Sequence, residues 1–135
     1  MDLMTSMCPC GSGKLFDDCC APIISGQCDA ETAEALMRSR YVAFTLANVD
    51  YLMRTWHSRY RPVRDRKKIL AWAKSVKWLG LQVIATESGL PDDEKGIVEF
   101  RAMFVEDGKM SHIHERSQFE REKGHWVYVT GVHMK

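Results

Sequence analysis

The stretch IVEFRAMFVEDGKMSHIHERSQFE, residues 97–120, holds two runs of alternating apolar and polar residues around Asp107-Gly108. Such alternation is typical of strands with one buried face, and Asp-Gly is a strong signal for a two-residue hairpin turn. That turn fixes the register and places Phe100 opposite Glu115, and opposed residues share a face of the sheet. The predicted core face carries Val98, Phe100, Ala102, Phe104, Ile113 and Phe119.

The other face of the hairpin is polar. Glu99 and Arg116 oppose each other there and are predicted to form an ordinary surface ion pair. His112 and His114 point to the same side, as residues two apart on a strand do. Because the sequence offers them no third ligand, we expect solvated histidines rather than a metal site.

Glu115 is the exception on the apolar face. A lone carboxylate in a core is costly, so either its proton stays on or a cation meets it. Arg40 lies within the apolar stripe of a predicted helix, where nothing else explains a guanidinium. The sequence therefore predicts an Arg40–Glu115 pair across the helix–sheet interface. The residues expected to take the leftover hydrogen bonds are Ser117, Thr130 and Tyr128.

Working outward from the hairpin, strands are predicted at 81–88 and 125–132, and three helices precede them. The predicted N-caps of these helices are Asp29, Asn48 and Asp65. Pro62 separates the second helix from the third, and the third is expected to end near Gly80. Helices followed by antiparallel strands predict an α+β fold, with the helices packed on one face of the sheet.

Composition narrows the class of protein. The chain has 135 residues, 45% of them hydrophobic, which suits one compact domain with its own core. Its 19 basic and 18 acidic residues give no global electrostatic case for nucleic acid or an anionic membrane. We find no membrane span and no signal region, and expect a cytoplasmic protein in which thiols stay reduced.

Four of the five cysteines stand at positions 8, 10, 19 and 20. The nearby GSGK lacks the glycine and the Ser or Thr of a phosphate loop, and a C-x-x-C redox pair is absent. Four thiolates at this spacing suit a closed tetrahedral metal site, and redox-active thiols remain the alternative. Gly11 and Gly13 would shape the turn, and Lys14 would offset part of the charge. Cys28 is predicted to be a spare thiol.

The segment CPCGSGKLFDDCC closely resembles the SEC-C zinc motif, which also occurs at the C-terminus of the SecA translocation motor. The resemblance implies one structural Zn²⁺ held by Cys8, Cys10, Cys19 and Cys20. The helix and strand order resembles the NTF2-like (cystatin-like) fold, a curved sheet cupping helices. With LMRSRYVAF, NVDYLMRTWH, VEFRAMF and HERSQF, the chain resembles the YchJ-type bacterial proteins. We therefore divide it into a SEC-C motif at 1–28 and an NTF2-like domain at 29–135, with Ile23 and Ile24 joining them.

The resemblance implies a fold and a metal but no activity, so two functions are weighed. The first is a protein-interaction module that docks a partner through the zinc knuckle, with the basic run 59–68 as a weaker site for RNA or the ribosome. The second is a small-molecule binder or enzyme with an NTF2-like pocket around Glu115. The expected pocket residues are Arg40, Tyr41, Trp56, Glu115, Ser117 and Tyr128. The first function, without catalysis, is the preferred prediction. An open, deep cavity in which Glu115 keeps its proton would favour the second, and a closed core with Glu115 neutralised by a basic neighbour would favour the first.

Overall fold

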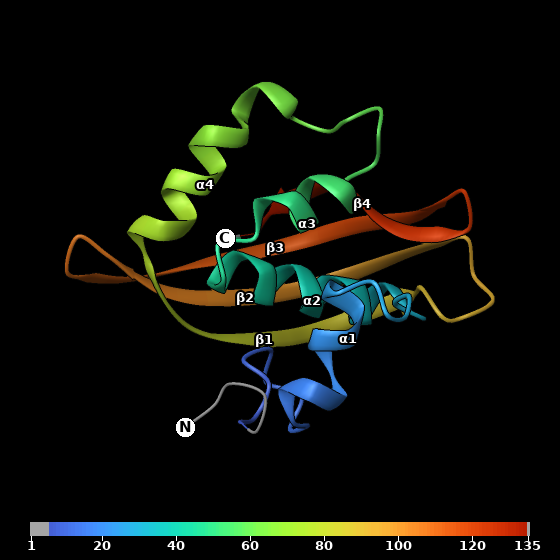
Figure 1. The fold of residues 1–135 in the computed structure, drawn as a ribbon, viewed down its shortest axis with the longest axis horizontal. Helices are drawn as coiled ribbons and strands as arrows, with labels where there is room; N and C mark the ends of the chain where they lie inside the picture. The colour runs from blue at the N-terminus through green and yellow to red at the C-terminus, as the bar shows by residue number, and fades with distance from the viewer. Residues whose placement is uncertain (1–5, 135) are drawn as a thin grey trace.

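The computed structural model describes residues 6–134. The chain runs η2 (Phe16–Asp18), α1 (Cys20–Ile24), α2 (Ala33–Thr45), α3 (Val49–Arg54), η3 (Val63–Asp65) and α4 (Arg66–Ser75), followed by four strands. The strands are β1 (Lys77–Ser88), β2 (Lys95–Glu106), β3 (Lys109–Glu122) and β4 (His125–His133). They form one antiparallel sheet in sequence order, which confirms the α+β prediction. Figure 1 shows α2 and α3 crossing one face of the sheet, with α1 beside α2.

The central hairpin follows the predicted register. Phe100 pairs with Glu115 and Glu99 with Arg116, and the turn residues Asp107 and Gly108 both have positive φ. The predicted core face is buried at Val98, Ala102, Phe104 and Phe119. Register shifts within β1 and near Gln118 add bulges that bend and twist the strands. The sheet can therefore curve around the helices.

The first long helix starts later than predicted. Thr32, not Asp29, is the N-cap of α2, and its Oγ1 accepts a hydrogen bond from Ala35 N at 3.0 Å. The carbonyl of Gly89, in the turn after β1, accepts from Ala33 N at 2.9 Å, so a long-range contact fixes where the helix begins. Asp29 instead pairs with His125 in an exposed contact. The other predicted caps lie where expected, and Asn48 Oδ1 accepts from Tyr51 N.

We expect Thr32→Ala to lower the free energy of unfolding by about 1 kcal/mol, since an N-cap hydroxyl satisfies a helix N–H that otherwise loses its partner. Asp29→Ala is the matched control and should cost less than about 0.5 kcal/mol, because an exposed ion pair contributes little. Urea unfolding of both variants measures this. A larger loss for Asp29→Ala than for Thr32→Ala would contradict the observed cap.

The third predicted helix ends at Ser75 rather than near Gly80. Lys77 pairs with Val105 across the sheet, so residues from 77 onward extend β1. Trp78 packs its ring edge-on against Trp72, with centroids 5.3 Å apart. Sheet pairing and aromatic packing thus override the local helical pattern at this point.

One continuous group of buried side chains joins the cysteine-rich segment to the sheet. It includes Cys8, Cys10, Phe16 and Cys20 together with Leu36, Met37, Tyr41, Val42, Val98 and Phe119. Ile23 and Ile24 pack against this group, as predicted for the joining residues. The cysteine-rich segment therefore shares one buried core with α2 and the sheet. Among residues 6–134, no helix combines the length and apolar character needed to cross a bilayer.

Candidate metal centre and adjoining cavity

Backbone hydrogen bonds shape the cysteine-rich segment into a closed loop. Cys8 N donates to Lys14 O at 2.7 Å, and Gly11 N donates to Cys8 O at 3.1 Å. Gly11 has φ +79°, and a Cβ there would lie 3.2 Å from the carbonyl oxygen of Leu81 on β1. The loop can therefore turn tightly and rest against the sheet only because a glycine stands at this position.

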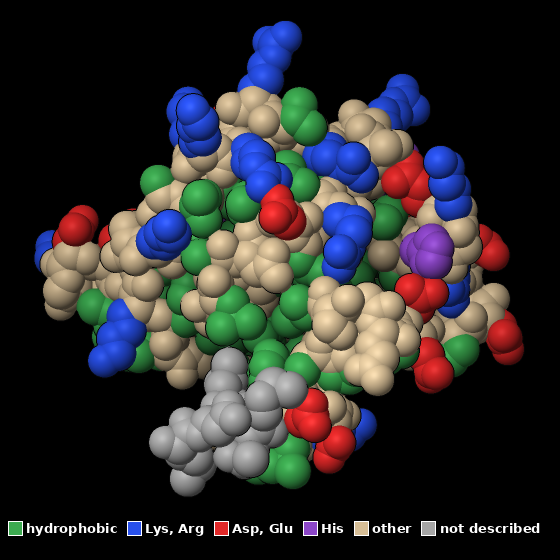
Figure 2. All heavy atoms as spheres, viewed as in Figure 1, with side chains coloured by type: hydrophobic (Ala, Val, Ile, Leu, Met, Phe, Trp, Pro, Cys, Tyr) green, Lys and Arg blue, Asp and Glu red, His purple; other side chains and the backbone are tan. Residues whose placement is uncertain are grey.

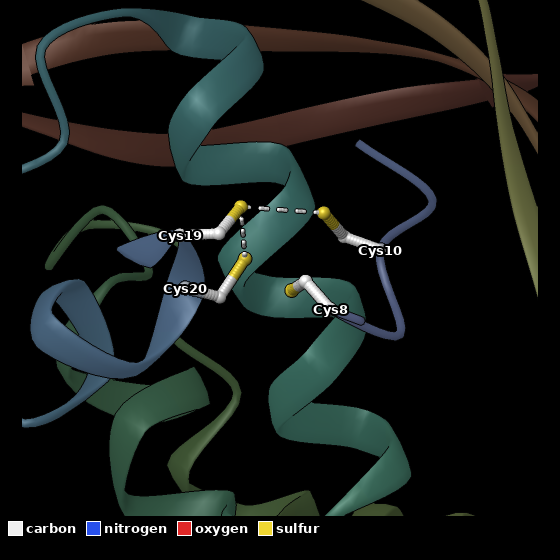
Figure 3. A group of neighbouring side chains, drawn as sticks. All are labelled: Cys8, Cys10, Cys19 and Cys20. Atoms are coloured by element: carbon white, nitrogen blue, oxygen red, sulfur yellow. Dashed lines mark hydrogen bonds between the residues drawn. The ribbon is translucent and has the colours of Figure 1, made fainter. Parts of the chain in front are cut away.

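The four predicted ligands converge, as Figure 3 shows. Their sulfur atoms all lie within 4.8 Å of one another. Cys10 Sγ is 3.6 Å from Cys19 Sγ, and Cys19 Sγ is 3.8 Å from Cys20 Sγ. A tetrahedral site with metal–sulfur bonds of about 2.3 Å separates its sulfurs by about 3.8 Å. The geometry therefore fits one metal ion bound by four thiolates.

The pKa shifts of the clustered cysteines are also relevant to metal binding. Hydrogen bonds from Cys20 and Cys8 hold the pKa of Cys10 far below its usual range. The same contact with Cys10 raises the pKa of Cys8 to about 11, and that of Cys20 is raised as well, chiefly by Cys10. Metal ligands must be deprotonated, and a cation among the sulfurs would supply the positive charge that stabilises the thiolates of Cys8, Cys10 and Cys20.

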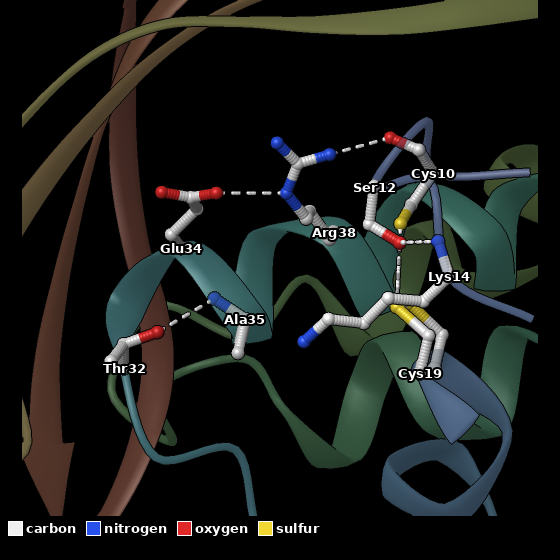
Figure 4. Close-up of polar contacts among 9 residues, drawn as sticks. Cys10, Ser12, Lys14, Cys19, Thr32, Glu34, Ala35 and Arg38 are labelled. Atoms are coloured by element: carbon white, nitrogen blue, oxygen red, sulfur yellow. Dashed lines mark hydrogen bonds and ion pairs between the residues drawn. The ribbon is translucent and has the colours of Figure 1, made fainter. Parts of the chain in front are cut away.

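Two side chains support the cluster from outside (Figure 4). Ser12 Oγ lies 3.2 Å from Cys19 Sγ. Arg38 reaches from α2, donating from Nε to Glu34 and from Nη1 to the carbonyl of Cys10 at 2.7 Å. The sequence had pointed to Lys14 as the compensating cation. Arg38 was missed because 28 positions separate it from Cys10, and no local pattern marks the contact. Cys28 is exposed and lies outside the cluster.

The predicted Arg40–Glu115 pair does not form. Arg40 donates from Nη1 to the carbonyl of Leu52 at 2.9 Å and to Thr55 Oγ1 at 2.7 Å. Its guanidinium lies 4.9 Å from the ring centroid of Trp56 and 4.8 Å from that of Tyr128. Burial lowers the pKa of Arg40 to about 10. The aromatic rings and α3 therefore take the place that the sequence had given to a carboxylate.

Glu115 is held by its neighbours on the sheet. Its Oε1 accepts hydrogen bonds from Ser117 Oγ at 3.0 Å and from Tyr128 Oη at 2.9 Å. Ser117 and Tyr128 were among its predicted partners, whereas Thr130 is exposed and makes no such bond within the described chain. Burial, together with the charge of Glu115, raises the pKa of Tyr128. Tyr128 thus stands between the two charged groups, its ring toward Arg40 and its hydroxyl toward Glu115.

A cavity of about 220 Å³ lies between the helices and the sheet. All six residues predicted for the pocket line it: Arg40, Tyr41, Trp56, Glu115, Ser117 and Tyr128. Much of the remaining wall is aromatic, including Trp72, Trp78 and Phe100. Trp72 comes from α4, and its place in the wall was missed because the path of α4 over the sheet is not visible in the sequence. The cavity combines apolar walls with two fixed, oppositely charged groups.

Other polar residues lie away from both sites. His114 Nε2 is 2.7 Å from Glu99, which also pairs with Arg116 on the outer sheet face, and His112 is exposed. His57 lies beside Glu120 at the end of the sheet. The basic run 59–68 leads into α4. Figure 2 shows Lys and Arg side chains over this part of the molecule as separate groups rather than one continuous patch.

Comparison with known proteins matches both parts of the chain. Residues 4–22 match the SEC-C motif, and residues 32–131 match the YchJ middle NTF2-like domain. A UPF0225 protein of Geobacter sulfurreducens is 42% identical over 98% of this chain and 82% of its own length. The UPF0225 protein YchJ of Shigella dysenteriae is 43% identical over 96% of this chain and 84% of its own.

Solved structures agree with the fold. The solution structure of a SEC-C motif containing protein from Rhodopseudomonas palustris superposes with a TM-score of 0.85 at 37% identity, covering 95% of this chain and 98% of that one. A crystal structure of a SEC-C motif containing protein from Psychrobacter arcticus gives 0.83 at 30% identity, covering 100% and 86%. Fold and site together define an NTF2-like domain joined to a SEC-C motif. The chain belongs to the YchJ (UPF0225) family.

Proposed function

We propose that the four-cysteine cluster holds one Zn²⁺ whose role is structural. Four cysteine sulfurs at tetrahedral spacing suit zinc, and they leave no open position for a substrate. Three of the four, Cys8, Cys10 and Cys20, are buried. Elemental analysis of the purified chain should give one zinc per chain. Stoichiometric iron, or protein with no metal, would contradict this assignment.

We further propose that the protein binds a small molecule in the cavity between helices and sheet. The observation that carries this proposal is the pair of charged groups on the cavity wall. Arg40 makes no ion pair with Glu115, so its charge does not close the site as an internal salt bridge would. Small-molecule sites are mostly apolar with a few fixed polar groups, and this cavity has that composition.

A substitution that fills the cavity tests this proposal. Ala102 lines it from β2 and is 3% exposed, so Ala102→Leu should occupy the space with added methyl groups. Ligand-observed NMR can screen a mixture of small aromatic compounds against both proteins. We expect some of these compounds to bind the wild type, and we expect their dissociation constants for Ala102→Leu to be at least about tenfold higher. Zinc content and thermal unfolding show whether the variant is folded. Equal binding to both proteins, or no binder, would contradict the proposal.

The second candidate function is docking of a protein partner through the knuckle. The side chains that favour it are Met7 and Leu15, which are 57% and 42% exposed on facing arms of the loop. Paired apolar groups at the surface can serve as a contact for another protein. Leu15→Ser leaves the metal ligands intact. A partner captured by the wild type and lost by this variant would support docking, and equal capture by both would contradict it.

A further inference from the structure

Arg40 retains hydrogen-bonding capacity that the described chain does not use. The residue is 6% exposed, and Nη1 donates both to Leu52 O on α3 and to Oγ1 of Thr55, the C-cap of that helix. Among residues 6–134, no hydrogen bond is made by Nε or Nη2 of this side chain. Trp56 and Tyr128 cover the guanidinium at 4.9 and 4.8 Å, and the residue borders the cavity. A buried guanidinium with spare donors at a cavity wall is suited to a ligand that offers an acceptor.

Glu115 offers the complementary acceptor. Both of its hydrogen bonds within the described chain go to Oε1, so Oε2 remains available. Gly131 on β4 makes room for the carboxylate, because a Cβ there would lie 1.6 Å from Oε1. The side chain is therefore seated against β4, where nothing larger than glycine fits. Because the carboxylate is held in place, its free oxygen Oε2 can accept a hydrogen bond from a ligand N–H or O–H.

The two charges balance, and one small molecule can reach both. Tyr128 links them, since its ring lies 4.8 Å from the Arg40 guanidinium carbon and its hydroxyl 2.9 Å from Glu115. Tyr128 therefore contacts both charged groups. A charged ligand would leave an uncompensated charge in a poorly solvated space, which is unfavourable. An uncharged ligand keeps the balance.

The size and walls of the cavity restrict the ligand further. A volume of about 220 Å³ is below the roughly 300–1,000 Å³ of drug-sized sites, so it suits a compound with one ring or two fused rings. The aromatic rings on the wall, such as Trp56 and Trp78, favour stacked or edge-on contacts with another planar ring.

We infer that the cavity takes an uncharged planar aromatic compound that bears an amide or lactam. The carbonyl oxygen of the ligand accepts from Arg40, its N–H donates to Glu115, and its ring lies among the aromatic side chains. This inference rests on the proposed small-molecule function and names the ligand class for it. The ligand binds without forming or breaking a covalent bond.

Three probes of nearly equal size separate the possibilities: benzamide, benzoate and benzylamine. Benzamide supplies both acceptor and donor without charge, benzoate is an anion with acceptors, and benzylamine is a cation with donors. We expect the dissociation constant of benzamide, measured by calorimetry or NMR titration, to be at least about tenfold lower than those of the other two, or about 1.4 kcal/mol. Tightest binding of benzoate or benzylamine would overturn the inferred class while leaving the proposed binding function intact.

Glu115→Gln tests the charge argument itself. The variant leaves Arg40 uncompensated, so benzoate should bind at least about tenfold more tightly than to the wild type and overtake benzamide. Glu94→Gln, at an exposed position in the β1–β2 turn, is the matched control and should leave all three constants unchanged. An unchanged probe order in Glu115→Gln would overturn the role given to Glu115. If none of the probes binds, the inference is wrong, and the proposed function is then decided separately by Ala102→Leu.

Discussion

Cys20→Ser is expected to destabilise the whole domain, lowering the free energy of unfolding by about 4 kcal/mol or more. Cys20 is 1% exposed and belongs to the buried group that includes Leu36, Met37 and Val98. Structural zinc contributes on the order of 10 kcal/mol to the folding of small zinc domains, and a missing ligand forfeits much of this. Urea unfolding followed by fluorescence and circular dichroism measures the loss, and elemental analysis measures the zinc.

Cys28→Ser is the matched control, since Cys28 is exposed and outside the cluster. It should keep its zinc and unfold within about 0.5 kcal/mol of the wild type. The expectation for Cys20→Ser would be contradicted by a variant that loses zinc yet keeps the wild-type unfolding midpoint. Such a result would mean that the sheet and α2 are stable without the knuckle.

Arg40→Met is expected to cost about 2–4 kcal/mol. The substitution removes charged hydrogen bonds to Leu52 O and Thr55 Oγ1, and each such bond is worth about 1.5–3 kcal/mol. It also removes two cation–π contacts, with Trp56 and Tyr128. Relief of the desolvation that lowers the pKa of Arg40 offsets part of this loss. Urea unfolding of the variant measures the sum.

The double variant Arg40→Met, Glu115→Leu separates the observed arrangement from a direct pair. Glu115 bonds to Ser117 and Tyr128 rather than to Arg40, so the interaction energy between the two substitutions should be below about 1 kcal/mol. A double variant much more stable than Arg40→Met alone, with an interaction energy above about 2 kcal/mol, would contradict the observed arrangement. It would favour the direct Arg40–Glu115 ion pair that the sequence predicted.

The features that could be predicted from the sequence depend on local geometry. Asp107-Gly108 determines the turn type, and the turn sets the register that places Glu115 opposite Phe100. The four clustered cysteines stand on two short segments, so their spacing already limits the geometry of a metal that they could hold. Asn48 caps its own helix three residues away. In each case the determining contact lies within about a dozen positions.

The features that were missed depend on contacts between distant segments. Gly89 O fixes the start of α2, and pairing with β2 moves Lys77 into a strand. The acceptors that Arg40 uses come from α3 and its C-cap residue. The sequence located Arg40 and Glu115 on facing surfaces but could not show that the ring of Tyr128 would come between them. Side-chain packing in three dimensions, rather than propensity, decided these outcomes.

The division of the chain at residue 28 remains a prediction about folding, whereas the packing makes the knuckle part of the core. We propose that binding of the metal and packing of the core form one cooperative unit. Hydrogen–deuterium exchange of the wild-type protein, before and after removal of the metal with a chelator, tests it most directly. We predict that amides of α2 and β2 lose protection together with residues 6–28. Loss confined to residues 6–28, with α2 and β2 still protected, would contradict the claim.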